Sequence, residues 1–149
     1  ARLFDHQHII ELAEYASIPV INALSDIEHP CQALADILTV KQKFGSIQGL
    51  NIAYVGDANN CALSLGLAAV SQGANYKIIS PEAYGFSAND QHKILARASG
   101  QKNAEVEFYT GTSPKDAIEG SHVIYTDVWT SMGQESEAQI RESAFQGFQ

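Results

Sequence analysis

About a third of the way along the chain stands Ile52-Ala53-Tyr54-Val55-Gly56-Asp57-Ala58-Asn59-Asn60, a short apolar run that leads into a glycine and a polar turn. The run predicts a buried strand that ends at Gly56, and the apolar residues 61–72 predict a helix that ends at Gly73. A strand followed by a tight turn and a helix is typical of a unit in which the next strand runs parallel to the first.

The same alternation of strand and helix continues along the rest of the chain. The pattern predicts further strands over Tyr76–Ser80, Val106–Tyr109 and Val123–Thr126. It predicts helices over Asn89–Ser99, Ser113–Glu119 and Glu135–Phe145, with Asn89 as a candidate cap. We therefore expect an α/β fold in three layers, with a parallel sheet flanked by helices on both faces.

The first third of the chain has helices but no repeated strands. Helices are predicted over Asp5–Ala16 and Pro30–Phe44, with a short extended run from Ile18 to Leu24 between them. Pro30 suits the first turn of the second helix, and Gly45 ends it. The sequence thus predicts a boundary near residues 45–49, with residues 1–45 in one part and residues 46–149 in the other.

Composition excludes several classes of partner. The 149 residues have a formal net charge of −8, from 9 basic and 17 acidic side chains, which disfavours nucleic acid and anionic membranes but not a small anionic substrate. No apolar run approaches the roughly 20 residues of a membrane span. Cys31 and Cys61 lack disulfide or zinc spacing, so we expect free thiols, no metal and a reducing cytoplasm. Because the chain begins at Ala1, we expect a processed or excised product.

Three polar segments can provide chemistry. In Glu28-His29-Pro30-Cys31-Gln32, a histidine and a glutamine flank a helix start, where a carbonyl or anion could bind, although a simple cap explains the spacing better. The second segment is Gly56–Asn60, for which a turn and a binding amide are equally good interpretations. The third, Asp127–Glu135, combines a carboxylate, a hydroxyl, a flexible apolar side chain and a glycine; the alternative is an ordinary loop followed by a capped helix.

In this order, the three segments resemble the ornithine carbamoyltransferase family. Residues 20–36, with His29-Pro30-Cys31-Gln32 inside them, look like a carbamoyl-phosphate motif. Residues 56–60 and 127–133 look like the amino-acid-binding segments. The resemblance covers nearly the whole chain. It implies a Rossmann-like ornithine-binding domain, incomplete at its C-terminus, after the end of a carbamoyl-phosphate domain and its linking helix.

The resemblance also implies a role for particular residues. Arg2 and His29 would be catalytic, with His29 polarising the carbamoyl oxygen, and Gln32 would contact the carbamoyl nitrogen. The residues implied for ornithine are Leu24, Asn60, Asp127, Ser131 and Met132. The implied reaction converts ornithine and carbamoyl phosphate to citrulline and phosphate without a metal or cofactor. The full-length enzyme would be a cytoplasmic homotrimer.

The resemblance has gaps. The family's Ser-Thr-Arg-Thr phosphate loop would precede Arg2, and its His-Cys-Leu-Pro segment would follow Gln149, and neither is in this sequence. We therefore expect no citrulline synthesis by this chain alone. Two alternatives stay open: a carbamoyltransferase for putrescine or another amine, and a non-catalytic amino-acid-binding or interaction domain derived from this fold.

Overall fold

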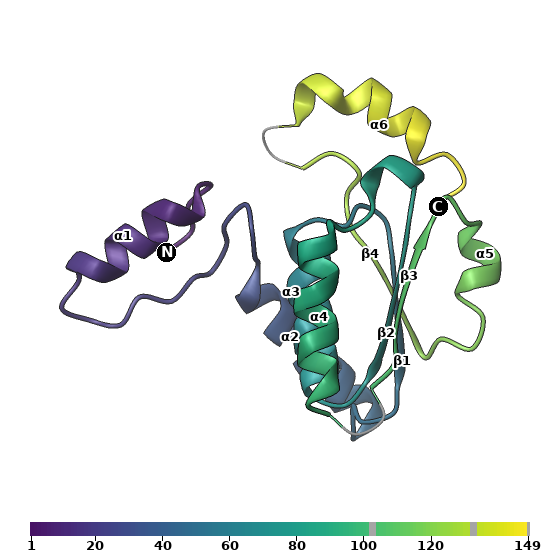
Figure 1. Cartoon of the computed structure of the whole chain (residues 1–149), viewed down its shortest axis with the longest axis horizontal. Coiled ribbons are helices and arrows are strands. Elements are labelled where there is room, and N and C mark those ends of the chain that lie inside the picture. Colours follow the sequence, from purple (N-terminus) through teal and green to yellow (C-terminus); the bar gives the residue numbers. More distant parts are fainter. Residues whose placement is uncertain (102–103, 132–133, 149) are drawn as a thin grey trace.

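One parallel sheet forms the centre of the computed structural model, which describes residues 1–101, 104–131 and 134–148. The strand order is β3-β2-β1-β4, and the strands are β1 (Asn51–Val55), β2 (Asn75–Ser80), β3 (Val106–Thr110) and β4 (Val123–Thr126). All three neighbouring pairs are parallel. The chain builds outward from β1 to β3 and then returns to the other side of β1 (Figure 1). The four predicted strands are confirmed.

The helices agree with the predicted order. They are α1 (His6–Tyr15), α2 (Pro30–Phe44), α3 (Asn60–Ser71), α4 (Ala88–Ser99), α5 (Pro114–Ala117) and α6 (Ala138–Ala144), with short 3-10 turns η1 (Glu82–Tyr84) and η2 (Glu135–Glu137). The prediction for α2 is confirmed at both ends: Pro30 stands in its first turn, and Gly45 follows it with a φ of 78°.

Two helix predictions were wrong in detail. The cap of α4 is Ser87, whose side chain accepts a hydrogen bond from the backbone N–H of Asp90, whereas Asn89 lies inside the helix. The single helix predicted over Glu135–Phe145 is divided, because the N–H of Glu137 bonds to the carbonyl of Gln134 and so tightens the first turn into η2.

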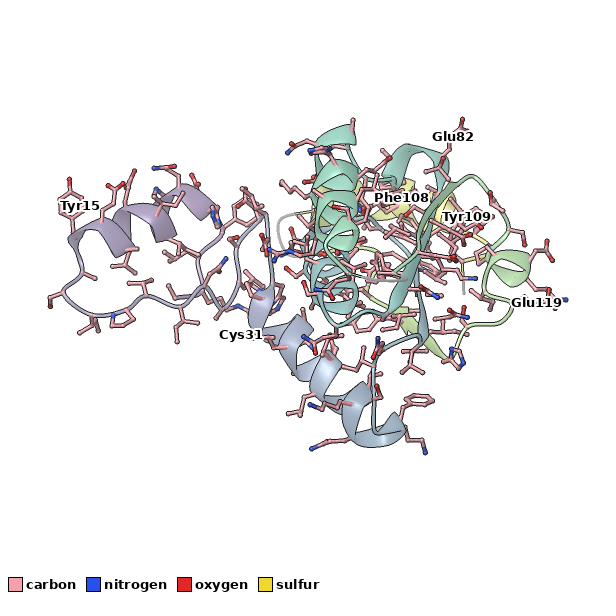
Figure 2. All side chains as sticks on the ribbon, turned by 60° about the horizontal axis from the view of Figure 1, so that its bottom comes forward. Tyr15, Cys31, Glu82, Phe108, Tyr109 and Glu119 are labelled. Carbon is pink, nitrogen blue, oxygen red and sulfur yellow. The ribbon has the colours of Figure 1, made fainter. Side chains whose placement is uncertain are left out.

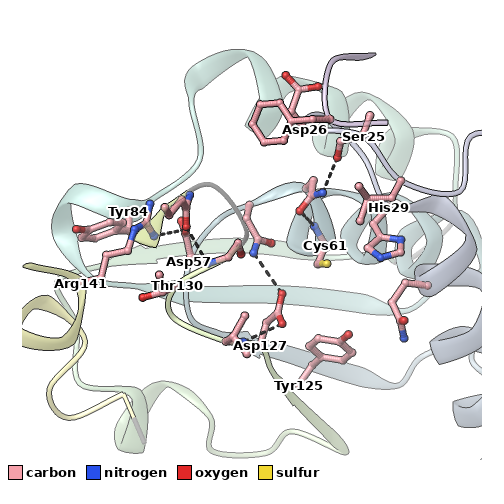
Figure 3. A pocket seen from close by; sticks show the side chains of 18 of the residues that line it. Ser25, Asp26, His29, Asp57, Cys61, Tyr84, Tyr125, Asp127, Thr130 and Arg141 are labelled. Atoms are coloured by element: carbon pink, nitrogen blue, oxygen red, sulfur yellow. Dashed lines mark hydrogen bonds and ion pairs between the residues drawn. The ribbon is translucent and has the colours of Figure 1, made fainter. Parts of the chain in front are cut away.

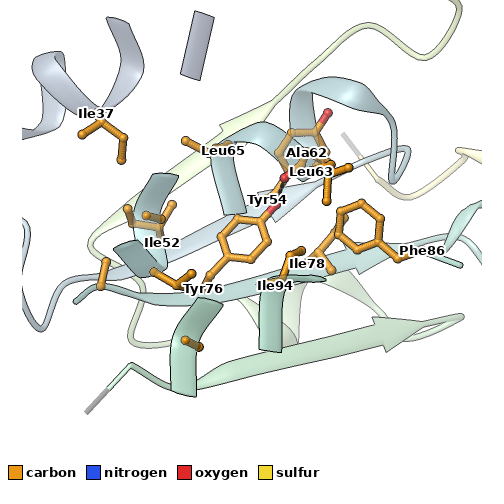
Figure 4. Close-up of a cluster of buried hydrophobic side chains, with 14 of the residues drawn as sticks. Ile37, Ile52, Tyr54, Ala62, Leu63, Leu65, Tyr76, Ile78, Phe86 and Ile94 are labelled. Carbon is orange, nitrogen blue, oxygen red and sulfur yellow. Dashed lines mark hydrogen bonds between the residues drawn. The ribbon is translucent and has the colours of Figure 1, made fainter. Parts of the chain in front are cut away.

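The main core lies between the sheet and one layer of helices. Side chains alternate along a strand, so Ile52 and Tyr54 of β1 join a cluster with the buried residues of α3 and α4 (Figure 4). Helix α3 approaches the sheet closely at Gly66, where a Cβ atom would lie 2.7 Å from the ring of Tyr76. Helix α2 packs against α3 and adds Ile37 to the same cluster.

The opposite face of the sheet has a thinner cover. Ala53, Val55 and Ile79 pack there against Ala117 and Ile118, at the end of α5, and against Phe148. At the edge of the sheet, Ile124 of β4 is 54% exposed. The predicted α/β fold, a parallel sheet flanked by helices, is therefore confirmed, with one helical layer much thinner than the other.

Residues 1–29, called the N-terminal arm below, extend away from the sheet and are joined to it by α2 (Figures 1 and 2). The extended run predicted at Ile18–Leu24 forms no strand, only an isolated parallel bridge between Arg2 and Leu24. Many apolar side chains of the arm are exposed, among them Phe4, Tyr15 and Ile21. Within the described residues, no helix has both the length and the apolar character that a membrane crossing requires.

Candidate functional site

A cavity of about 790 Å³ lies beyond the carboxyl ends of β1 and β4 (Figure 3). The N-terminal arm, the loops after β1, β2 and β4, and helix α6 all contribute side chains to its wall. The strand order reverses between β1 and β4, and the crevice at such a point is where ligands bind in open parallel sheets. The position of the cavity thus follows from the topology.

The arm presents three of the residues predicted for substrate binding, and backbone pairing within the arm positions two of them, Arg2 and Leu24. Backbone bonds from Leu3 N to the Leu24 carbonyl (3.1 Å) and from Ala23 N to the Ala1 carbonyl (2.8 Å) join two parts of the arm. This pairing sets Arg2 beside Leu24, and both line the cavity.

His29 stands at the N-cap position of α2 and also lines the cavity. Its backbone N–H donates to the Ser64 hydroxyl of α3 at 2.9 Å, and the same hydroxyl donates to Glu28 Oε2 at 3.3 Å. Within the described part of the chain, the imidazole Nδ1 is buried without a hydrogen-bond partner. A buried polar atom without a partner is destabilising, and such atoms are often found at functional sites.

Gln32, in the first turn of α2, is oriented by Asp36. Its amide Nε2 donates to Asp36 Oδ1 at 2.9 Å. With the NH₂ group engaged in this way, the amide oxygen of Gln32 is the atom left to accept a hydrogen bond. That arrangement suits the predicted contact to a carbamoyl nitrogen.

The turn after β1 connects to both sides of the cavity. Asn60 Nδ2 donates to the carbonyl of Ser25 on the arm at 2.6 Å, and Asn59 Nδ2 donates to Asp127 Oδ2 at 3.3 Å (Figure 3). Asn59 is also the N-cap of α3, because its side chain accepts from Ala62 N. Each asparagine therefore has a structural function, and Asn60 keeps its second amide hydrogen for a ligand.

Asp127 follows β4 and brings negative charge into the cavity. Its Oδ1 accepts from the backbone N–H of Val128 at 2.8 Å, and no cation pairs with it among the described residues. Burial, and then the neighbouring Asp127, raise the pKa of the Cys61 thiol to about 12. Burial raises the pKa of Tyr125 as well, with Asp36, Cys61 and Asp127 adding to the effect. Cys61 and Tyr125 therefore stay neutral at pH 7, and the carboxylate of Asp127 supplies the negative charge on this side of the cavity.

Ser131 lies further along the same loop and also lines the cavity. Its backbone N–H donates to Gln134 Oε1 at 3.1 Å. The prediction for Met132 lies outside the described residues. The structure thus brings Arg2, Leu24, His29, Gln32, Asn60, Asp127 and Ser131 to one cavity.

Sequence reasoning missed several residues of the cavity wall. Asp57 and Arg141 form an ion pair of 2.7 Å there, and Tyr84 lies beside them. Asp57 could have been suspected, because it lies in the turn two residues after the end of β1. Nothing in the sequence indicated that Arg141 lies in the cavity wall, because an arginine in a polar helix is normally exposed to solvent.

A parallel sheet with a polar cavity at its switch point defines an α/β ligand-binding domain. Two family models match this chain: "Aspartate/ornithine carbamoyltransferase, Asp/Orn binding domain" over residues 48–149, and the "carbamoyl-P binding domain" of the same family over residues 1–42. The chain belongs to the aspartate/ornithine carbamoyltransferase family.

Individual relatives agree with the family assignment. Ornithine carbamoyltransferase of Thermococcus kodakarensis is 50% identical over 151 residues, which cover 100% of this chain and 46% of the relative. The enzyme of that name from Prochlorococcus marinus is 46% identical, with 99% and 45% covered. The solved structure of ornithine carbamoyltransferase from Pyrococcus furiosus superposes with a TM-score of 0.91 at 44% identity, covering 100% of this chain and 47% of that one. This chain therefore spans about half the length of these relatives.

Proposed function

We propose that the full-length gene product transfers the carbamoyl group of carbamoyl phosphate to the δ-amine of ornithine, giving citrulline and phosphate. The observation that supports this most directly is the carboxylate of Asp127, which pairs with no cation among the described residues and shares the cavity with Arg2 and His29 of the arm. A cationic amino acid would be held on the Asp127 side, and an anionic carbonyl compound on the arm side. The names of the relatives agree with this pair of substrates.

In this proposal the cavity wall supplies orientation and charge rather than a covalent intermediate. The δ-amine attacks the carbonyl carbon, the new C–N bond forms, the amine releases a proton, and the C–O bond to phosphate breaks. His29 and Arg2 donate hydrogen bonds toward the carbonyl oxygen and the phosphate, which stabilises the oxyanion of the tetrahedral intermediate. Gln32 accepts from the carbamoyl NH₂ and so fixes its direction.

The amino-acid end of ornithine is assigned to the opposite wall. Asp127 and Ser131 would contact the α-ammonium group, and Asn60 would donate its free amide hydrogen to the α-carboxylate. Leu24 and Met132 would pack along the aliphatic part. A diamine such as putrescine lacks both α-groups, so it would leave these polar contacts unmade.

We also propose that the chain consists of parts of two domains, one for each substrate. Residues 1–45 would be the end of the carbamoyl-phosphate domain with its linking helix, and residues 46–149 the ornithine-binding domain. The ranges of the two family models support this division. The homotrimer, the cytoplasmic location and the inactivity of the isolated chain stay predictions from the resemblance.

The test is steady-state kinetics of the full-length gene product and its Asp127→Ala variant, with citrulline as the measured product. Removing the carboxylate should raise the KM for ornithine about tenfold or more, equivalent to about 1.4 kcal/mol, and leave the KM for carbamoyl phosphate nearly unchanged. Asp116→Ala, at an exposed position of α5, is the matched control and should behave as wild type.

Each alternative predicts a different result. If Asp127→Ala raised the KM values for ornithine and carbamoyl phosphate equally, the assignment of Asp127 to ornithine binding would be rejected. Preferential turnover of putrescine would favour the diamine enzyme. Ornithine binding without any citrulline formation, in the presence of carbamoyl phosphate, would favour a binding domain.

A further inference from the structure

Arg141 of α6 is the only charged residue that is buried in the described part of the chain. Its side chain is 8% exposed and reaches from α6 toward the ends of three strands. Burying a guanidinium is costly unless its donors are satisfied, so its contacts indicate why it is there.

The contacts of Arg141 join the segments that surround the amino-acid end of the cavity. Nη1 donates to Asp57 Oδ2, in the loop after β1, at 2.7 Å, and to the carbonyl oxygen of Trp129, in the loop after β4, at 3.3 Å. The guanidinium carbon lies 4.9 Å from the centre of the Tyr84 ring, which follows β2 (Figure 3). Burial alone would lower the pKa of Arg141, but the hydrogen bond and charge of Asp57, together with Glu137 and Tyr84, raise it overall.

The remaining contact of Arg141, with Glu137, is local in sequence and exposed to solvent. Nε donates to Glu137 Oε2 at 3.1 Å, but that carboxylate side chain is 56% exposed and belongs to the turn directly before α6. It therefore adds little to the connection between loops. Phe145, one turn beyond Arg141 and fully buried, stacks on Trp129 with ring centres 5.9 Å apart and so supports the same loop.

We propose that Arg141 is a positioning residue that fixes the loop from Asp127 to Ser131 against the loop after β1, and thereby sets the affinity for the amino-acid substrate. Trp129, whose carbonyl accepts from Arg141, lies midway between the two predicted ligand contacts of that loop. Asp57 lies two and three residues before Asn59 and Asn60, which bond to Asp127 and to the arm. The part of the inference that concerns substrate affinity rests on the proposed function.

The first experiment measures the environment of the loop from Asp127 to Ser131 by fluorescence and does not depend on enzymatic activity. Trp129 is the only tryptophan in the sequence, so its fluorescence in the 149-residue chain reports on this loop alone. In Arg141→Met, the emission should shift to longer wavelength and acrylamide quenching should rise about twofold, at a temperature where circular dichroism shows a folded chain. An unchanged Trp129 signal in the folded variant would overturn the inference.

Matched variants separate the loop contact from general stability. Arg141→Met leaves Asp57, whose side chain is only 14% exposed, as an unpaired charge and could fail to fold, whereas Asp57→Asn with Arg141→Met removes both charges together. The double variant should show the same change of Trp129 fluorescence. Glu137→Ala, which removes only the exposed contact of Arg141, should not.

The second experiment measures kinetics in the full-length gene product. The double variant should raise the KM for ornithine about tenfold and change the KM for carbamoyl phosphate by less than about twofold, because only one wall of the cavity moves. Arg141→Lys, which keeps the charge beside Asp57, should recover part of the affinity. Equal changes in both KM values, or a lower melting temperature with unchanged kinetics, would reject the positioning role. If the wild type uses another acceptor amine, the proposed function fails, and the same comparison with that amine still decides the role of Arg141.

Discussion

Replacing Gly66 by alanine should destabilise the protein, although alanine is the better helix former. An added Cβ would lie 2.7 Å from Cε1 of Tyr76 and 3.1 Å from Cδ1 of Ile94. Tyr76 cannot move away freely, because it is 1% exposed and its hydroxyl donates to the Ala62 carbonyl at 2.9 Å. Overpacking typically costs about 1–3 kcal/mol, and the strained hydrogen bond adds to this, while the gain in helix propensity returns about 1 kcal/mol.

The expected net loss in the free energy of unfolding is about 2 kcal/mol. Urea denaturation of the 149-residue chain, followed by far-ultraviolet circular dichroism, measures it as a lower midpoint at unchanged slope. Gly100→Ala is the control, because its φ is −79° and the nearest atom to its Cβ would be 3.6 Å away. That variant should be as stable as wild type or slightly more so. If Gly66→Ala had the same urea midpoint as Gly100→Ala, the close packing of α3 on β2 described above would be wrong.

Three further predictions follow from hydrogen bonds and burial. Because burial raises the pKa of Cys61 from 9.0 to about 12, the unfolded chain deprotonates first as pH rises through that window, so urea midpoints should fall there and fall less in Cys61→Ala. Asp36→Ala should free the amide of Gln32 and raise the KM for carbamoyl phosphate in the full-length product about fivefold, with the KM for ornithine unchanged. Ser64→Ala leaves the N–H of His29 without its acceptor, and should lower kcat and the melting temperature together.

The parts of the fold that were predictable from sequence have local causes. Pro30 and Gly45 fix the two ends of α2 by their own backbone preferences, so both ends were predicted correctly. The short strands stood out because apolar runs are bounded by glycine or polar turns. Asn89 was a wrong choice of cap because Ser87, two residues earlier, has an equally suitable side chain and the extended backbone that a cap needs.

The parts that were not predictable depend on contacts between distant residues. The ion pair of Arg141 with Asp57 spans 84 positions, and nothing in the local sequence of α6 distinguishes that arginine from one in solvent. The division of the last predicted helix into η2 and α6 could not be predicted either, because no glycine or proline lies at the break. The site residues could be proposed from the family resemblance, but the residues that hold them in place required the structure.

Helix α3 connects the two halves of the proposed active site. Its Ser64 hydroxyl accepts from the backbone of His29, and Asn60, its first residue, donates to the carbonyl of Ser25, so the arm is attached to the same helix whose N-cap, Asn59, bonds to Asp127. The proposed contacts to carbamoyl phosphate and to ornithine therefore share one support. A shift of α3 would change both walls of the cavity together, whereas a change at Arg141 would move only the ornithine wall. Because of this asymmetry, a comparison of the two KM values can distinguish a shared support from a local one.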